Sequence, residues 1–107
     1  MTTFDDREQG FEGKFAHDQD LEFKALARRN RLLGLWAGGL MGLEDPHLES
    51  YAEAVIRYEV AHPGEDAIQR KVAQDLIGSG LKVSEDQVRG KMDEFLAIAR
   101  GQLQAGD

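Results

Sequence analysis

Residues 84–103, SEDQVRGKMDEFLAIARGQL, contain the strongest helix signal in the chain. The segment opens with a capping box, in which the Ser84 hydroxyl reaches the backbone N–H of Gln87 and the Gln87 side chain reaches back. Apolar residues then follow at helical spacing along one face: Val88, Met92, Phe95, Leu96, Ala99 and Leu103. The pattern predicts an amphipathic helix over about residues 85–104, whose apolar face must pack against other parts of the chain.

Three further helical segments precede this one. They are predicted over about residues 19–43, 46–62 and 65–77. We expect Asp45 to be the N-cap of the second segment and Pro46 to take its first helical position, where the missing N–H does no harm. No run of alternating β-branched residues indicates a strand. The sequence therefore predicts an all-α protein, with a compact antiparallel four-helix bundle over residues 19–107.

Glycines recur at every fourth position near the end of the first predicted helix. Gly34, Gly38 and Gly42 share one helix face. A loop that cradles phosphates would need a preceding strand and a Lys-Ser or Lys-Thr pair, which this stretch lacks. We therefore interpret the three glycines as the site where another helix backbone approaches closely.

Residues 1–18 form a segment of a different character, an N-terminal arm. Phe4, Phe11 and Phe15 continue the apolar stripe of the first helix into this charged segment. Gly10 and Gly13, however, each cost about 1 kcal/mol relative to alanine in a helix interior. We expect the arm to be flexible or only marginally helical when free. Its phenylalanines either extend the bundle core or fold as a helix into a groove on a partner, and the glycines favour the partner.

Length and composition restrict the classes of function. The chain has 107 residues, a formal net charge of −7 and no cysteine. This length suffices for one modest core, and disulfides and thiolate metal sites are excluded. The acidic balance argues against nucleic-acid binding, which depends on Lys and Arg neutralising phosphates, and favours a basic or amphipathic partner.

The sequence predicts neither export nor insertion into a membrane. Arg28 and Arg29 precede an apolar run, as in a twin-arginine signal, but acidic residues crowd the preceding segment and no small-residue cleavage motif follows. The apolar run over residues 32–43 is also far shorter than the roughly 20 residues that a membrane span requires. We expect a soluble, cytoplasmic protein.

Residues typical of catalytic and metal sites do not cluster in the sequence. The serines are Ser50, Ser79 and Ser84, and the last is explained as a helix cap. The histidines His17, His47 and His62 lie beyond the helical spacing that metal ligands normally show. The sequence therefore predicts no enzyme, no metal site and no cofactor.

The local excess of positive charge at Arg28, Arg29 and Arg31 has two interpretations. These arginines either balance acidic residues one turn away, or bind a nucleotide phosphate or an acidic partner surface through their planar guanidinium groups. The second interpretation leads to an alternative function, a helical regulatory or binding module that responds to ATP or ADP.

Four blocks of sequence resemble a known family. FDDRE (4–8), EGKFAHD (12–18), FKALARRNRLLGLWA (23–37) and RKVAQDL (70–76), with Pro63-Gly64-Glu65-Asp66 between the last two, are similar to the zeta subunit of alpha-proteobacterial F-type ATP synthases, a family of small inhibitors. The resemblance spans essentially the whole chain.

The resemblance implies a four-helix bundle whose N-terminal arm inserts into the catalytic head of the ATP synthase. The arm would enter at an interface of alpha and beta subunits near the gamma shaft, and block ATP hydrolysis more than synthesis. Phe4, Phe11 and Phe15 would be buried by the head, while Arg7, Glu8 and Lys14 would form pairs at the rim. Such a protein would be cytoplasmic and peripheral to the inner membrane.

Overall fold

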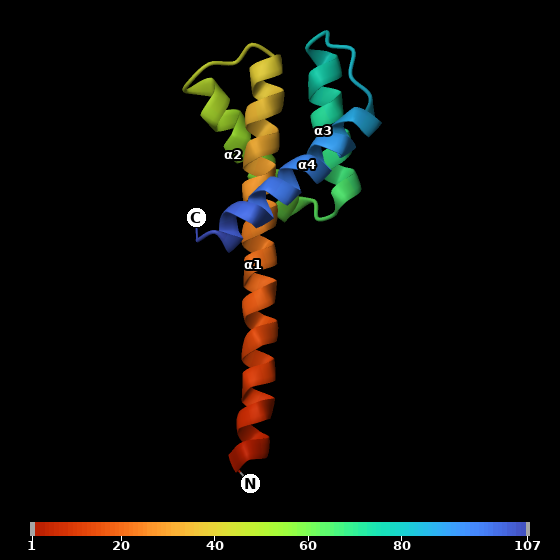
Figure 1. Ribbon diagram of the computed structural model, residues 1–107. Coiled ribbons are helices and arrows are strands. Elements are labelled where there is room, and N and C mark those ends of the chain that lie inside the picture. The colour runs from red at the N-terminus through yellow and green to blue at the C-terminus, as the bar shows by residue number, and fades with distance from the viewer. Residues whose placement is uncertain (1, 107) are drawn as a thin grey trace.

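The computed structural model describes the backbone of residues 2–106 and the side chains of residues 19–106. Four helices make up the fold: α1 (Thr2–Leu40), α2 (His47–Ala61), α3 (Glu65–Gly78) and α4 (Glu85–Gln104) (Figure 1). Within the described backbone there is no strand, so the predicted all-α, four-helix fold is confirmed.

Helix α1 is much longer than the other three helices. Its 39 residues form one continuous helix, which at about 1.5 Å per residue extends for roughly 58 Å. The molecule measures 65 × 25 × 22 Å. The N-terminal half of α1 accounts for this elongation, because it extends away from the bundle without another helix beside it (Figure 1). The remaining helices pack on the C-terminal half.

The core lies between the C-terminal half of α1 and the other three helices. Its fully or almost fully buried residues are Leu33, Ala37, Val55, Ile68, Val72, Ala73, Leu76, Val88 and Met92. Trp36 packs against this core, and its ring meets that of Phe95 edge to face, with the ring centroids 6.4 Å apart. Trp36 therefore lies on the core side of α1.

One of the three periodic glycines makes the expected close helix contact. A Cβ atom at Gly34 would lie 2.6 Å from the Cα atom of Ala52 in α2, so the two backbones could not approach as they do if position 34 had a side chain. Gly38 faces the side chain of Leu48 instead. The interpretation was wrong for Gly42, which lies beyond the end of α1 and has φ +84, and where a Cβ atom would meet nothing within 4 Å.

Gly42 ends α1 rather than packing against another helix. Its N–H donates to the carbonyl of Gly39, and the N–H of Leu43 donates to the carbonyl of Gly38. This is the Schellman arrangement, in which a glycine in the left-handed region allows the last carbonyls of a helix to be satisfied.

The helix ends show which local signals were reliable. The capping box at the start of α4 is confirmed, since the N–H of Gln87 donates to Ser84 Oγ over 3.1 Å and the N–H of Ser84 donates to Gln87 Oε1 over 2.8 Å. The predicted cap of α2 was wrong. Pro46 is the N-cap there, without a side-chain hydrogen bond, because the N–H of Leu48 that Asp45 would cap already donates to the carbonyl of Glu44.

Candidate functional site

The arm is the N-terminal part of α1, which extends beyond the bundle. Its backbone is helical from Thr2 onward (Figure 1). The residues predicted to bind a partner are Phe4, Arg7, Glu8, Phe11, Lys14 and Phe15, and their side chains lie outside the part of the chain whose side chains the structure describes. Their roles therefore stay predictions, as does the division into an arm over residues 1–18 and a bundle.

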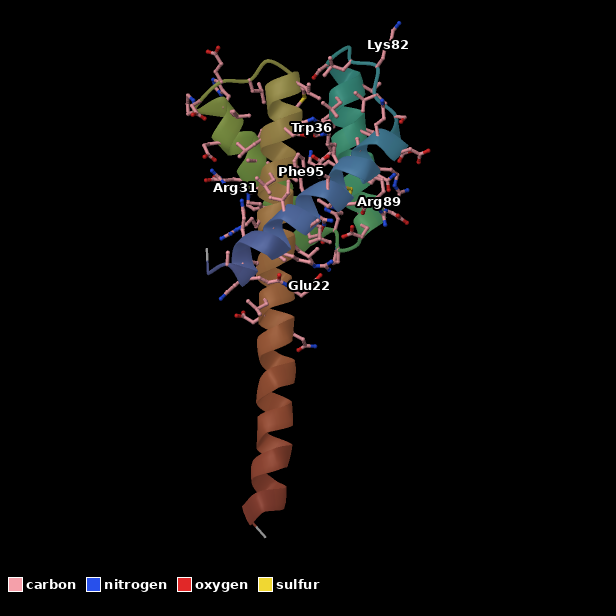
Figure 2. The ribbon with its side chains drawn as sticks, in the orientation of Figure 1. Glu22, Arg31, Trp36, Lys82, Arg89 and Phe95 are labelled. Carbon is pink, nitrogen blue, oxygen red and sulfur yellow. The ribbon has the colours of Figure 1, made fainter. Side chains whose placement is uncertain are left out.

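The arm joins the bundle at residues 21–25. Ala25 is the first α1 residue that the described side chains show as buried. Just before it, Glu22 accepts two hydrogen bonds from Arg100 of α4, from Nε over 3.3 Å and from Nη2 over 2.5 Å. Figure 2 shows Glu22 at the end of the bundle from which the arm extends. Both partners are about half exposed, so this pair orients the helices more than it stabilises them.

Arg29 is the central charged residue of this end of the bundle. Its side chain is fully buried, and both of its terminal nitrogens donate to the carboxylate of Glu65, over 2.8 and 2.9 Å. Its Nε donates to Asn30 Oδ1 over 2.8 Å, and Glu59 Oε2 lies 3.8 Å from Nη2. Arg29 thus connects α1 with the last turn of α2 and the first turn of α3.

The other two predicted arginines have different partners. Arg31 makes a two-pronged pair with Glu49 of α2, with N–O distances of 2.7 and 2.5 Å. Arg28 donates to Gln102 Oε1 of α4 over 3.3 Å. The three side chains thus hold α1 to three different parts of the bundle. A nucleotide phosphate at Arg29 or Arg31 would have to displace a carboxylate, and no observation here favours the nucleotide-binding interpretation.

The two carboxylates near Arg29 are shifted in opposite directions. Burial raises the pKa of Glu59 above its ordinary value, although Arg29 opposes the shift. Hydrogen bonds from Arg29 hold the pKa of Glu65 below its ordinary value. Glu59 therefore contributes stability that is lost as pH rises through its folded pKa, and Glu65 contributes stability that is lost as pH falls through its folded pKa.

We expect Glu59→Gln and Glu65→Gln to have opposite pH dependences. Relative to the parent chain, Glu59→Gln should become more favourable as pH rises from about 4 to about 7, because it removes a carboxylate that is disfavoured when charged. The destabilisation by Glu65→Gln should grow with pH over a lower interval, from the lowered pKa of folded Glu65 up to the ordinary glutamate value of about 4.3. Urea unfolding at several pH values measures both trends, and a common direction would contradict the assignment.

Comparison with known proteins shows the family of the chain. The sequence model described as ATPase inhibitor subunit zeta matches residues 1–102. The chain belongs to this zeta family. A relative whose structure was determined by NMR in solution has 34% sequence identity and a TM-score of 0.69, and the match covers 81% of this chain and 99% of that one. Among curated proteins the comparison finds no match.

The family is one of ATPase inhibitor subunits, and its description supports a regulatory role as an ATPase inhibitor for this chain. Within the described part of the chain, no helix has the length and apolar character needed to cross a membrane. The same residues contain no group of three or more His, Cys, Asp or Glu side chains that could hold a metal ion.

The buried cluster around Arg29 was missed from the sequence. The sequence pattern groups the three arginines as one local excess of positive charge, because they are close in sequence. The signal that could have separated them is helical phase, since Arg29 lies four residues from both Ala25 and Leu33, which are buried. A charged residue at that phase is expected to need a buried partner.

Proposed function

We propose that this chain inhibits the F-type ATP synthase by inserting its arm into the catalytic head, at an interface of alpha, beta and gamma subunits. The arm would block ATP hydrolysis from there. The observation that carries the proposal is the shape of α1, which continues as a helix well beyond the bundle with none of the other three helices beside it (Figure 1). The family, an ATPase inhibitor family, supports the same function.

The arm has the dimensions and composition of an inserted helix. Eighteen residues of α-helix are about 27 Å long, with a diameter of roughly 10 Å including side chains. Phe4, Phe11 and Phe15 fall on one helix face in the sequence pattern. Because the other helices lie elsewhere, we infer that a partner buries this face, and that Arg7, Glu8 and Lys14 form pairs at its edge.

Binding would also complete the folding of the arm. An isolated helix of this length is marginal in water, and Gly10 and Gly13 weaken it further. The free energy of ordering the arm is then supplied by contacts with the head, which lowers the net affinity and makes the inhibition reversible. The protein would be cytoplasmic, and peripheral to the inner membrane through the ATP synthase.

Deleting the arm tests the proposal directly. A chain that starts at Gln19 should no longer inhibit ATP hydrolysis by the purified catalytic head, whereas the full chain should inhibit it. The bundle should stay folded, because the buried residues that the structure describes start at Ala25. Circular dichroism and thermal unfolding check this control.

Point variants connect the loss to the aromatic face. Replacing Phe4, Phe11 and Phe15 together with alanine in the full chain should reproduce the effect of the deletion, since it removes the apolar area that we expect to be buried. Full inhibition by the chain that starts at Gln19 would overturn the proposal.

A further inference from the structure

A groove follows the surface where the arm meets the bundle. We call it the basal groove, and it consists of two adjoining hollows that share Phe23, Ala27 and Ile56. The first hollow, of about 350 Å³, runs between α1 and α2 to Val60 and Pro63. The second, of about 570 Å³, reaches Leu103 and Gly106 near the end of the chain. The groove therefore borders the base of the arm.

The first hollow is an exposed apolar patch. Phe23 is 66% exposed and Val60 is 71% exposed, and both line the same hollow. Single exposed apolar residues are normal on a protein surface, whereas apolar residues that share one hollow indicate a contact site. Asn30 and Glu59, the polar side chains of its lining, both belong to the buried Arg29 cluster. The hollow therefore suits an apolar side chain better than a polar small molecule.

The second hollow carries positive charge. Among the residues that the structure describes, its lining includes the cations Lys24, Arg28 and Arg31 and no Asp or Glu. This is unusual for a chain whose net charge is −7. Lys24 pairs with Asp20, and Arg31 pairs with Glu49. The four side chains are 43–57% exposed, so carboxylates of a partner could compete for the two cations. The basal groove as a whole therefore complements a surface that has an apolar side chain beside carboxylates.

We propose that the basal groove is a second contact with the catalytic head, and that it receives an apolar side chain flanked by carboxylates on the rim around the inserted arm. This inference rests on the proposed function. Phe23 follows residue 18 by five residues, about 7.5 Å along a helix. A site that encloses the arm to its last turn must therefore bring its rim against Phe23, and the two contacts form one continuous surface.

Surface substitutions in the full chain test this contact. The double variant Phe23→Ser, Val60→Asp is compared with Ile77→Asp. Val60 and Ile77 are both the penultimate residues of their helices, and Ile77 is 54% exposed near the opposite end of the bundle. The added charge therefore affects the helix dipole equally in the two proteins. Circular dichroism verifies that each variant is folded. If the double variant does not fold, the single variant Val60→Asp is used in its place.

Binding to the purified head and inhibition of ATP hydrolysis are both measured. We expect the concentration that gives half-maximal inhibition to be about tenfold higher, or more, for the double variant than for the parent chain. This is the effect expected for loss of an apolar anchor residue at an interface. Its maximal inhibition should stay unchanged because the arm is intact. Lys24→Glu should slow association at low salt, whereas Lys82→Glu, at the opposite end of the bundle (Figure 2), should not.

The outcomes separate the two proposals. If the full chain inhibits and the double variant inhibits equally, the basal groove is no contact and the arm proposal stands. If the full chain neither binds nor inhibits, both proposals are overturned. If the groove variants convert a dimer of this chain into a monomer without weakening head binding, a second copy occupies the groove and the inference is wrong.

Discussion

Replacing Arg29 with alanine is expected to lower the free energy of unfolding by about 3 kcal/mol, which is the lower end of the range for removing one partner of a buried ion pair. The side chain is fully buried, and its loss leaves Glu59 and Glu65 facing each other without the cation between them. We take the lower end because Glu65 is about one-third exposed, so water can partly solvate its carboxylate.

Two further substitutions make this prediction specific to burial. Arg29→Lys keeps the charge but not the planar fork that binds both oxygens of Glu65, so its effect should be intermediate. Arg31→Ala also removes a two-pronged pair, but that pair is exposed, and we expect a much smaller loss. Urea unfolding of the three variants gives the order, and an equal loss for Arg29→Ala and Arg31→Ala would refute the role of burial.

Gly34→Ala is expected to destabilise the bundle by about 2 kcal/mol, within the usual range for overpacking a tight contact. The new methyl group would lie 2.6 Å from the Cα atom of Ala52. This neighbour is backbone, so α1 and α2 would have to move apart, and they form the most extensive helix pair of the bundle. The gain in helix propensity from glycine to alanine, about 1 kcal/mol, is too small to compensate.

Gly90→Ala is the matched control for Gly34→Ala. Gly90 lies inside α4, and a Cβ atom there would meet nothing within 4 Å. The same substitution should therefore stabilise the protein by about 0.5–1 kcal/mol. Thermal or urea unfolding measures the change in stability of both variants. We expect the two changes to have opposite signs, a loss for Gly34→Ala and a gain for Gly90→Ala. Stabilisation by Gly34→Ala would show that the helices separate easily at this contact.

Local signals in the sequence predicted the helices well. The capping box at Ser84 acts within one helical turn, so its effect is independent of the rest of the fold. The start of α2 was less predictable. The N–H of Leu48, which Asp45 was expected to cap, donates to the backbone carbonyl of Glu44 in the preceding turn instead. Helices α2, α3 and α4 begin and end within one residue of the predicted ranges, whereas α1 begins at Thr2 instead of near residue 19, and the cap of α2 differs.

The candidate site was less predictable than the helices. The basal groove forms where the ends of α2 and α4 meet α1, so no local pattern marks Phe23 and Val60 as neighbours. Closeness in sequence groups Arg29 with Arg28 and Arg31, although helical phase separates it from them. Its partners Glu59 and Glu65 are 30 or more residues away in the chain, and only the packed bundle brings them together.

The unbroken helix from Thr2 to Leu40 has a consequence for how this chain can change in length. Each residue turns an α-helix by about 100°, so when the arm is helical, as in the inserted state, the bundle fixes the direction in which every arm position points. One inserted residue between arm and bundle would rotate the two by about 100°, whereas seven inserted residues would leave a difference of only about 20°. A loop would absorb such an insertion, but a continuous helix transmits it. Length changes at this junction should therefore be tolerated only in near-whole numbers of turns.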